Sequence, residues 1–168
     1  MRIAMTIMLF CISILSFGQS LQDTLLRELT PIDVQSNKNL KLLAGSFTVS
    51  DGFGGYTYRL DTSGAFERIE FADIGGSEVS AKGKVRVTTN HRLDLRSEKG
   101  HSTFDVFAFA TFFFLIPPAK VPAFKRDFSK AVSIFGKQRI YKVGDESKTV
   151  YLMIAFSLVS RYLVKGIE

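Results

Sequence analysis

Few residues in this chain have the types and spacing that enzyme chemistry needs. The two histidines, His91 and His101, stand outside any H-x-H or H-E-x-x-H pattern, so they do not predict a metal site. No serine stands in a G-x-S-x-G turn. Glu67 and Glu70 have opposite parity in one expected strand, which places their carboxylates on opposite faces. The sequence therefore predicts no catalytic set, no metal site and no cofactor, and we expect a protein that is not an enzyme.

Positive charge is the strongest global signal. The chain has 22 Lys and Arg against 16 Asp and Glu, for a formal net charge of +6. Five cations on two neighbouring expected strands would share one outward face: Lys82, Lys84, Arg86, Arg92 and Arg96. They are interpreted either as exposed strands that discourage edge pairing or as a face that attracts lipid headgroups, anionic glycans or an acidic partner. No stacking-aromatic signature accompanies them, so nucleic acid is not an expected partner.

Aromatic side chains form the second candidate site. If the expected strands close into a barrel, six of these side chains would line its interior: Tyr56, Tyr58, Phe66, Phe71, Phe112 and Phe114. One interpretation is that they simply fill a core. The other is that they line a cavity for a small hydrophobic or amphipathic ligand, because such cavities are mostly apolar and aromatic.

β-Strands must position these residues, because hydrophobicity alternates with a period of two between residues 40 and 116. Strand candidates include residues 43–49, 56–60 and 66–71, and turns rich in Gly, Asp and Ser separate them. This pattern predicts an antiparallel meander of about six or seven strands that forms a small barrel or sandwich.

The segment 104–116 is apolar on both faces, so we expect a single strand that is covered on both sides. One face would carry Phe104, Val106, Ala108, Ala110, Phe112, Phe114 and Ile116. The other would carry Phe107, Phe109, Phe113 and Leu115. The barrel interior can cover one face, and the C-terminal third of the chain is expected to cover the other.

Helices are expected at both ends of the barrel segment. Leucines at helical spacing predict a short helix over about residues 20–30, and residues 33–39 form a polar linker. A second helix is expected over residues 119–135, with Pro122 in its first turn and Gly136 at its end. After a short strand over residues 138–142, an apolar helix over residues 146–164 would pack on the barrel or touch a membrane. The expected divisions are therefore 19–39, a barrel domain over 40–142, and 143–168.

Residues 1–18 have the features of a secretory signal peptide. Arg2 supplies the positive end, and an apolar stretch of about eleven residues follows, well short of the ~20 that span a bilayer. Ser16 and Gly18 are the small residues that a signal peptidase requires, so we expect cleavage between Gly18 and Gln19. The expected location is periplasmic, secreted or envelope-associated. The sequence leaves the oligomeric state open.

Several short motifs together suggest a family. These are the strand opening L-A-G-S-F at residues 43–47, the loop D-G-F-G-G at 51–55, the hairpin S-G-A-F at 63–66 and the strand G-K-V at 83–85. The series resembles small secreted lipocalin-like β-barrel proteins, including uncharacterised exported proteins of Bacteroidota-type bacteria. Val85 stands where those proteins commonly have Trp, and the chain has no Trp. The resemblance covers about residues 40–116 and implies an envelope protein with an internal cavity or groove, without assigning any functional residue.

Overall fold

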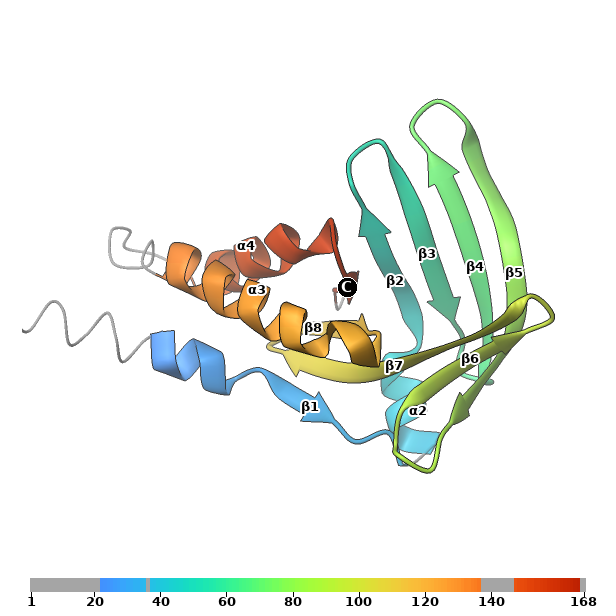
Figure 1. Cartoon of the computed structure of the whole chain (residues 1–168), viewed down its shortest axis with the longest axis horizontal. Helices are drawn as coiled ribbons and strands as arrows, with labels where there is room; N and C mark the ends of the chain where they lie inside the picture. The colour runs from blue at the N-terminus through green and yellow to red at the C-terminus, as the bar shows by residue number, and fades with distance from the viewer. Residues whose placement is uncertain (1–21, 36, 137–146, 167–168) are drawn as a thin grey trace, which may run out of the picture.

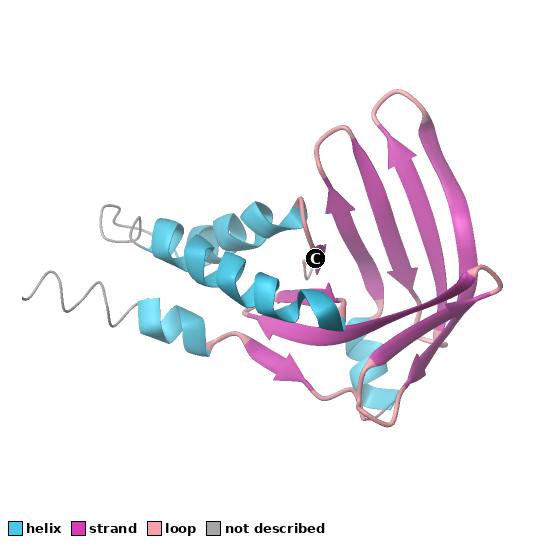
Figure 2. Cartoon of the chain, viewed as in Figure 1, coloured by secondary structure: helices cyan, strands magenta, loops and turns pink. Residues whose placement is uncertain are grey.

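The computed structural model describes residues 22–35, 37–136 and 147–166 (Figure 1). The strands form a curved wall on one side of the molecule, and most of the helices gather on the other (Figure 2). Three sequence predictions lie outside the described residues: the signal peptide, its cleavage after Gly18, and the strand over residues 138–142.

Among the described residues, nine strands form one antiparallel sheet. Their bounds are β1 Thr30–Ile32, β2 Gly45–Ser50, β3 Gly54–Leu60, β4 Ala65–Ala72, β5 Gly76–Val87, β6 Leu93–Ser97, β7 Gly100–Phe109, β8 Phe112–Ile116 and β9 Leu163–Lys165. Eight of these close into a barrel in the order β7–β6–β5–β4–β3–β2–β9–β8, because β8 pairs back with β7. Strand β1 pairs additionally with β7. The predicted antiparallel barrel is confirmed, but the predicted number of strands is too low.

A tight turn divides the long apolar strand expected from the sequence into β7 and β8. Ala110 has a φ of 50°, and Phe109 pairs with Phe112 across this turn. Directly paired residues point to the same side of a sheet, so the turn reverses the alternation that one continuous strand would have. Phe113 therefore faces the barrel interior, while Phe112 and Phe114 face the helices. The expected faces of these residues are thus exchanged.

Both faces of the β7–β8 hairpin are nevertheless covered, as the sequence predicted. Its inner face contributes to a cluster that fills the barrel interior: Val34, Leu43, Phe47, Tyr58, Leu60, Phe66, Leu93, Leu95, Phe104, Val106, Phe113, Leu115 and Leu163. Its outer face packs beneath the helices in a second cluster: Leu25, Phe107, Phe109, Phe114, Ile116, Phe124, Phe128, Ala131, Val132, Val150, Ile154, Ala155, Leu158 and Tyr162. Side chains of the first cluster fill the barrel interior at the end where the β3–β4 turn lies.

The helices are residues 22–27, α2 Asn37–Leu43, the short 3-10 helix η1 Pro118–Lys120, α3 Val121–Phe135 and α4 Ser147–Val159. Helix α3 forms where the sequence predicted, with Pro122 in its first turn and Gly136 as its C-cap. Its side chains Phe124 and Phe128 are fully buried. Helix α2 lies partly in the expected polar linker, and its last residue, Leu43, is buried in the barrel interior.

The C-terminal helix ends earlier than the sequence predicted. Helix α4 stops at Val159, and a turn in which the backbone N–H groups of Arg161 and Tyr162 donate to the carbonyl of Leu158 leads into β9. Strand β9 pairs with β8 and, through Thr48 and Val164, with β2. Leu163 and Val164 continue the apolar run of α4, and a short apolar run fits a helix or a buried strand equally well. The need to close the barrel decides for the strand.

Candidate functional site

At one end of the barrel the neighbouring β2–β3 and β4–β5 hairpins stand beside two hollows, and we call this end the mouth (Figure 1). Strands β3 and β4 place Tyr58 opposite Arg68 and Tyr56 opposite Glu70. Tyr58 belongs to the interior cluster, and Tyr56 packs against it. Side chains that are paired directly lie on one face, so Arg68 and Glu70 point inward as well. Strands β3 and β4 therefore bring aromatic rings, one cation and one carboxylate to the mouth.

Arg68 contacts two aromatic rings and one carboxylate in the mouth. Its guanidinium carbon lies 4.5 Å from the centre of the Tyr56 ring and 5.9 Å from that of Tyr58. One terminal nitrogen lies 3.1 Å from a carboxylate oxygen of Glu70. Its Nε is shielded from solvent and has no hydrogen-bond partner within the described part of the chain. A shielded donor without a partner is costly, so this N–H would gain a partner if the guanidinium moved toward an acceptor that a ligand brings.

An irregularity in β5 accompanies Arg68. The register between β4 and β5 shifts between Arg68 and Ile69, which leaves Ser80 as an extra residue on β5. The Ser80 hydroxyl donates to the carbonyl of Arg68 over 3.3 Å. Such a bulge bends a strand and changes the direction of nearby side chains. Here it fixes the backbone of Arg68 at the point where the side chain enters the barrel.

Two hollows meet at Arg68 and Glu70. The outer one has a volume of about 420 Å³ and is bordered by Tyr56, Phe71 and Glu78 as well. The deeper one has a volume of about 210 Å³ and extends past Tyr58, Phe66 and Leu95 to polar residues of β6 and β7, including Ser97 and Ser102. Ligand sites commonly occupy ~300–1,000 Å³, so the mouth has the size of a small-ligand site.

Electrostatics distinguishes Tyr56 from an ordinary surface tyrosine. Burial is the main cause that raises the pKa of its hydroxyl above 10.0; the nearby Tyr58 adds to this effect, and the charge of Arg68 opposes it. Tyr56 is therefore neutral at physiological pH. Its ring and hydroxyl can contact a ligand without adding charge next to Glu70.

The structure brings together three of the six aromatic residues expected to line a cavity. Tyr56 borders the outer hollow, and Tyr58 and Phe66 border the deeper one. Phe71 was expected on the wrong face: it pairs with Gly55 and alternates out of phase with the inward Phe66, so its side chain points outward. Phe112 and Phe114 were expected on the wrong face as well: Phe114 is buried in the helix-side cluster, and Phe112 packs against that cluster. The turn at Ala110 is the physical reason, since it reverses the alternation after β7.

Neither Arg68 nor Glu70 was predicted from the sequence to belong to the site. Glu70 was considered only as half of a catalytic pair. Strand alternation could have identified both residues, because positions 68 and 70 point to the same face of the strand as the inward Phe66. That alternation places a charged pair inside a barrel, where an ionisable side chain more often marks a binding site than a core position.

The five cations of the expected basic face lie on β5, on β6 or just before β6. Three of them have acidic partners: Lys82 Nζ lies 2.7 Å from Glu67, Arg92 Nε 2.8 Å from Asp105 and Arg96 Nε 2.5 Å from Asp94. Lys84 and Arg86 form no ion pair with the described residues. Across the sheet, Lys84 is paired directly with Arg96, and Arg96 with His101. Among the described residues, the face thus contains two cations without an ion pair, Lys84 and Arg86, beside three that are neutralised.

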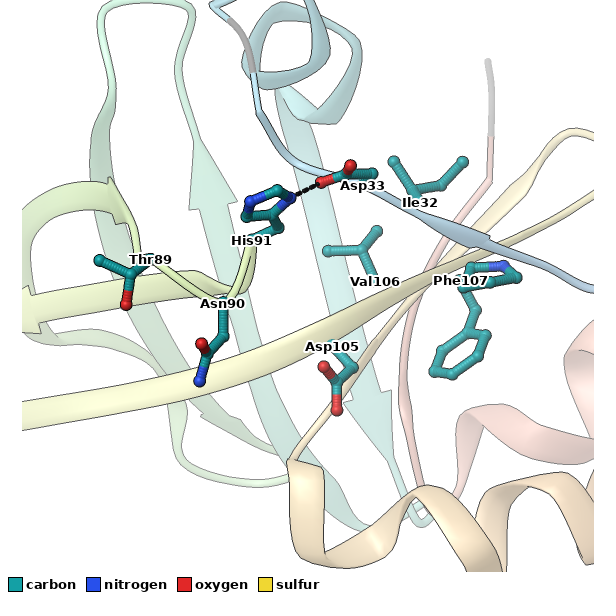
Figure 3. A pocket seen from close by; sticks show the side chains of 9 residues that line it. Ile32, Asp33, Thr89, Asn90, His91, Asp105, Val106 and Phe107 are labelled. Atoms are coloured by element: carbon teal, nitrogen blue, oxygen red, sulfur yellow. Dashed lines mark hydrogen bonds and ion pairs between the residues drawn. The ribbon is translucent and has the colours of Figure 1, made fainter.

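A third hollow, of about 560 Å³, lies between β1, β7 and the turn before β6. In it, His91 Nδ1 and Asp33 Oδ1 are 2.5 Å apart, and Figure 3 shows these two side chains pointing toward each other. Thr89 and Asn90 point away from this pair (Figure 3). About half of each paired side chain is exposed. This arrangement holds the segment after β1 to the turn. Within the described ranges the His91 ring bonds to Asp33 and Gln35, neither of which carries a hydroxyl or thiol nucleophile.

The described residues contain no group of three or more His, Cys, Asp or Glu side chains that could hold a metal ion. None of their helices has the length and apolar character needed to cross a bilayer. Comparison with known proteins gives no match to a protein-family model, a curated protein or a solved structure. The interpretation of the mouth therefore depends on its own geometry.

Proposed function

We propose that this protein binds a small amphipathic ligand in the mouth of its barrel, with an acidic group of the ligand on Arg68. The observation that carries the proposal is the inward Arg68, which stacks on Tyr56 and keeps a shielded Nε without a partner among the described residues. A carboxylate or phosphate accepts from a guanidinium in a charge-assisted, often bidentate geometry. Such a group would give Nε its missing acceptor.

The rest of the mouth suits the apolar part of such a ligand. The rings of Tyr56 and Tyr58 stand edge to face with centres 5.7 Å apart, and Tyr58 continues the same contact to Phe66 at 5.8 Å. These rings form an aromatic wall beside the cation. Side chains fill the barrel interior at the end where the β3–β4 turn lies. The ligand is therefore a short one that occupies the mouth, rather than a long chain that extends through the whole barrel.

Glu70 competes with a ligand anion for Arg68. It forms an ion pair with Arg68 in the structure and is paired across the sheet with Glu78. The second carboxylate strengthens the hold of these acids on Arg68, because like charges directly opposite each other are unfavourable without a cation beside them. An incoming anion must therefore compete with Glu70 for Arg68. Binding would thus exchange an internal ion pair for a ligand ion pair.

Binding of octanoate, with uncharged octanol as the matched probe, tests this function. We expect Arg68→Gln to weaken octanoate binding by about tenfold or more, since charged hydrogen bonds contribute ~1.5–3 kcal/mol. Octanol binding should change little. Lys84→Gln, on the outer face, is the control. Equal octanoate affinity for wild type and Arg68→Gln, measured by titration calorimetry, would contradict the assignment of Arg68.

We further propose that the protein is exported and acts in the cell envelope by binding rather than by catalysis. The features of residues 1–18 support export. N-terminal sequencing of the protein from its own cells should give a chain that begins at Gln19. A chain that retains Met1 in the cytoplasmic fraction would contradict this part of the proposal.

A second candidate function is docking to an anionic envelope component through the basic face. Lys84 and Arg86 favour it, because they share the basic face and neither forms an ion pair with the described residues, so both are available to an anion. Inorganic polyphosphate is a suitable probe. Binding should weaken with salt and with Lys84→Gln, and should be unaffected by Arg68→Gln.

A further inference from the structure

Two large apolar side chains protrude from the rim of the mouth. Phe53, in the β2–β3 turn, is 81% exposed, and Ile74, in the β4–β5 turn, is 101% exposed. The two turns stand next to each other at the mouth of the barrel (Figure 1). A single exposed apolar residue on a surface is ordinary. Two of the most exposed ones at adjacent tips, beside a candidate ligand site, need an explanation.

The two tips are held in place by hydrogen bonds. The backbone N–H of Asp73 donates to the carbonyl of Phe53 over 2.9 Å, which joins one turn to the other. The Asp51 carboxylate accepts from the N–H groups of Phe53 and Gly54 at 3.0 and 3.1 Å. Phe53 and Ile74 are therefore presented together on ordered turns, although neither contributes a buried side chain to the fold.

The outer surface of the barrel changes character along the strands. Near the tips, Val79 of β5 is 47% exposed and is paired with Ile69 of β4. Three residues further from the tip, about 10 Å along a strand, Lys82 begins the basic face. An apolar end followed by cations matches the order of acyl chains and phosphate groups at a lipid surface.

The size of the apolar tips helps to identify what they contact. Two such side chains offer on the order of 300 Å² of apolar surface. A stable protein interface buries more, ~800 Å² of surface per partner. A bilayer, in contrast, accepts isolated apolar side chains without a complementary pocket. The tips also carry Asp51 and Asp73, whose charges would oppose a strongly anionic surface.

We propose that Phe53 and Ile74 insert into the surface of a bilayer that is mainly zwitterionic and orient the mouth of the barrel toward it. The contact requires only the two tips, so it does not depend on whether Arg68 binds a ligand. If the mouth does bind an amphipathic ligand, this orientation lets the ligand pass directly between bilayer and barrel.

Co-sedimentation with phosphatidylcholine vesicles measures the contact. We expect the double variant Phe53→Ser, Ile74→Ser to partition at least tenfold less than wild type, because two inserted apolar side chains are lost. Phe156→Ser is the matched control, since Phe156 is 65% exposed on α4, outside the mouth. Arg68→Gln should bind vesicles like wild type. Equal partitioning of the double variant and the wild type would overturn the proposal.

A fluorescent reporter gives a second test, because the chain contains no Trp. The emission of Phe53→Trp and of Ile74→Trp should shift to the blue on vesicles and be quenched by brominated lipid. Phe156→Trp should show neither change. Blue shifts at all three positions would overturn the assignment to the tips. A dimer seen by light scattering and abolished by the double variant would also overturn it, because the tips would then cover a second copy.

Discussion

The guanidinium carbon of Arg68 lies 4.5 Å from the centre of the Tyr56 ring, so a cation and an aromatic face meet inside the mouth of the barrel. A guanidinium in this position is attracted to the ring and remains able to bind an anion with its N–H groups. Tyr56 is consequently a reporter of the state of Arg68, as well as part of the wall of the site.

The first prediction concerns the titration of Tyr56. Its pKa is raised above 10.0 mainly by burial, and the charge of Arg68 opposes this rise. Arg68→Gln should therefore raise the pKa of Tyr56 further. Ultraviolet titration, with Tyr56→Phe subtracted to isolate the signal, measures the change. An unchanged or lowered pKa in Arg68→Gln would show that the two side chains do not interact in solution.

The second prediction concerns the core beneath the helices. Phe124 is fully buried, and its ring contacts those of Phe107, Phe114 and Tyr162 at 5.1–5.3 Å. Phe124→Ala should lower the free energy of unfolding by about 3–5 kcal/mol, through lost transfer energy and a residual cavity. Phe156→Ala, at an exposed site, should stay within about 0.5 kcal/mol of wild type. Denaturation in urea measures both, and similar losses would contradict the packing described here.

The third prediction concerns alkaline stability. Burial and a 2.9 Å hydrogen bond to Asp127 raise the pKa of Tyr162 to about 12. The pKa of Tyr162 is higher in the folded state than in the unfolded state. The contribution of Tyr162 to the free energy of unfolding is therefore fully present below pH 10.0 and is lost as the pH rises toward about 12. Stability should fall by up to about 2–3 kcal/mol over this window. Tyr162→Phe should remove that part of the fall in a urea series at increasing pH, and an equally steep fall in Tyr162→Phe would contradict the assignment.

The same pair acts with the opposite sign in acid. The hydrogen bond from Tyr162 is the largest cause that lowers the pKa of Asp127 below 3.8, and Arg161 adds to it. The contribution of Asp127 to the free energy of unfolding is thus present above about pH 4 and is lost as the pH falls through the lowered pKa. Tyr162→Phe should flatten this acid limb as well, which a general loss of packing would not do.

The fourth prediction concerns the close approach of β5 and β6. A Cβ on Gly83 would lie 1.9 Å from the carbonyl oxygen of Arg96, so Gly83→Ala must push the strands apart. It should destabilise the protein by about 1–3 kcal/mol or more. Gly75 is the control, since a Cβ there would meet only the Ala72 methyl at 3.5 Å. Thermal unfolding of both variants is the measurement, and equal midpoints would refute the predicted clash.

The comparison between sequence and structure is most informative at three places. Helix α3 was predictable because its apolar spacing, Pro122 and Gly136 all act locally. The turn at Ala110 was not, because it has no Gly or Asn and uses a positive φ that alanine rarely adopts. Strand β9 was not predictable either, since its apolar run also fits a helix.

The candidate site divides in the same way. Alternation in β3 places Tyr56 and Tyr58 on one face, and the sequence assigned both of them to the interior. Arg68 follows the same alternation, but its value depends on Tyr56, Tyr58 and Glu70 meeting across two strands. The pair of His91 and Asp33 joins residues 58 positions apart, and nothing local predicts it.

By itself, the sequence determined a β-rich chain with an apolar segment that needs cover on both faces, because alternation and turn residues act over a few positions. Only the tertiary structure decided which side chains share the barrel interior. Closure joins β8 and β9 to strands far away in the chain, and one turn at Ala110 exchanges the faces of every residue that follows it in β8. The pairing of these distant strands depends on how the whole sheet fits together, and a local sequence pattern does not encode that fit.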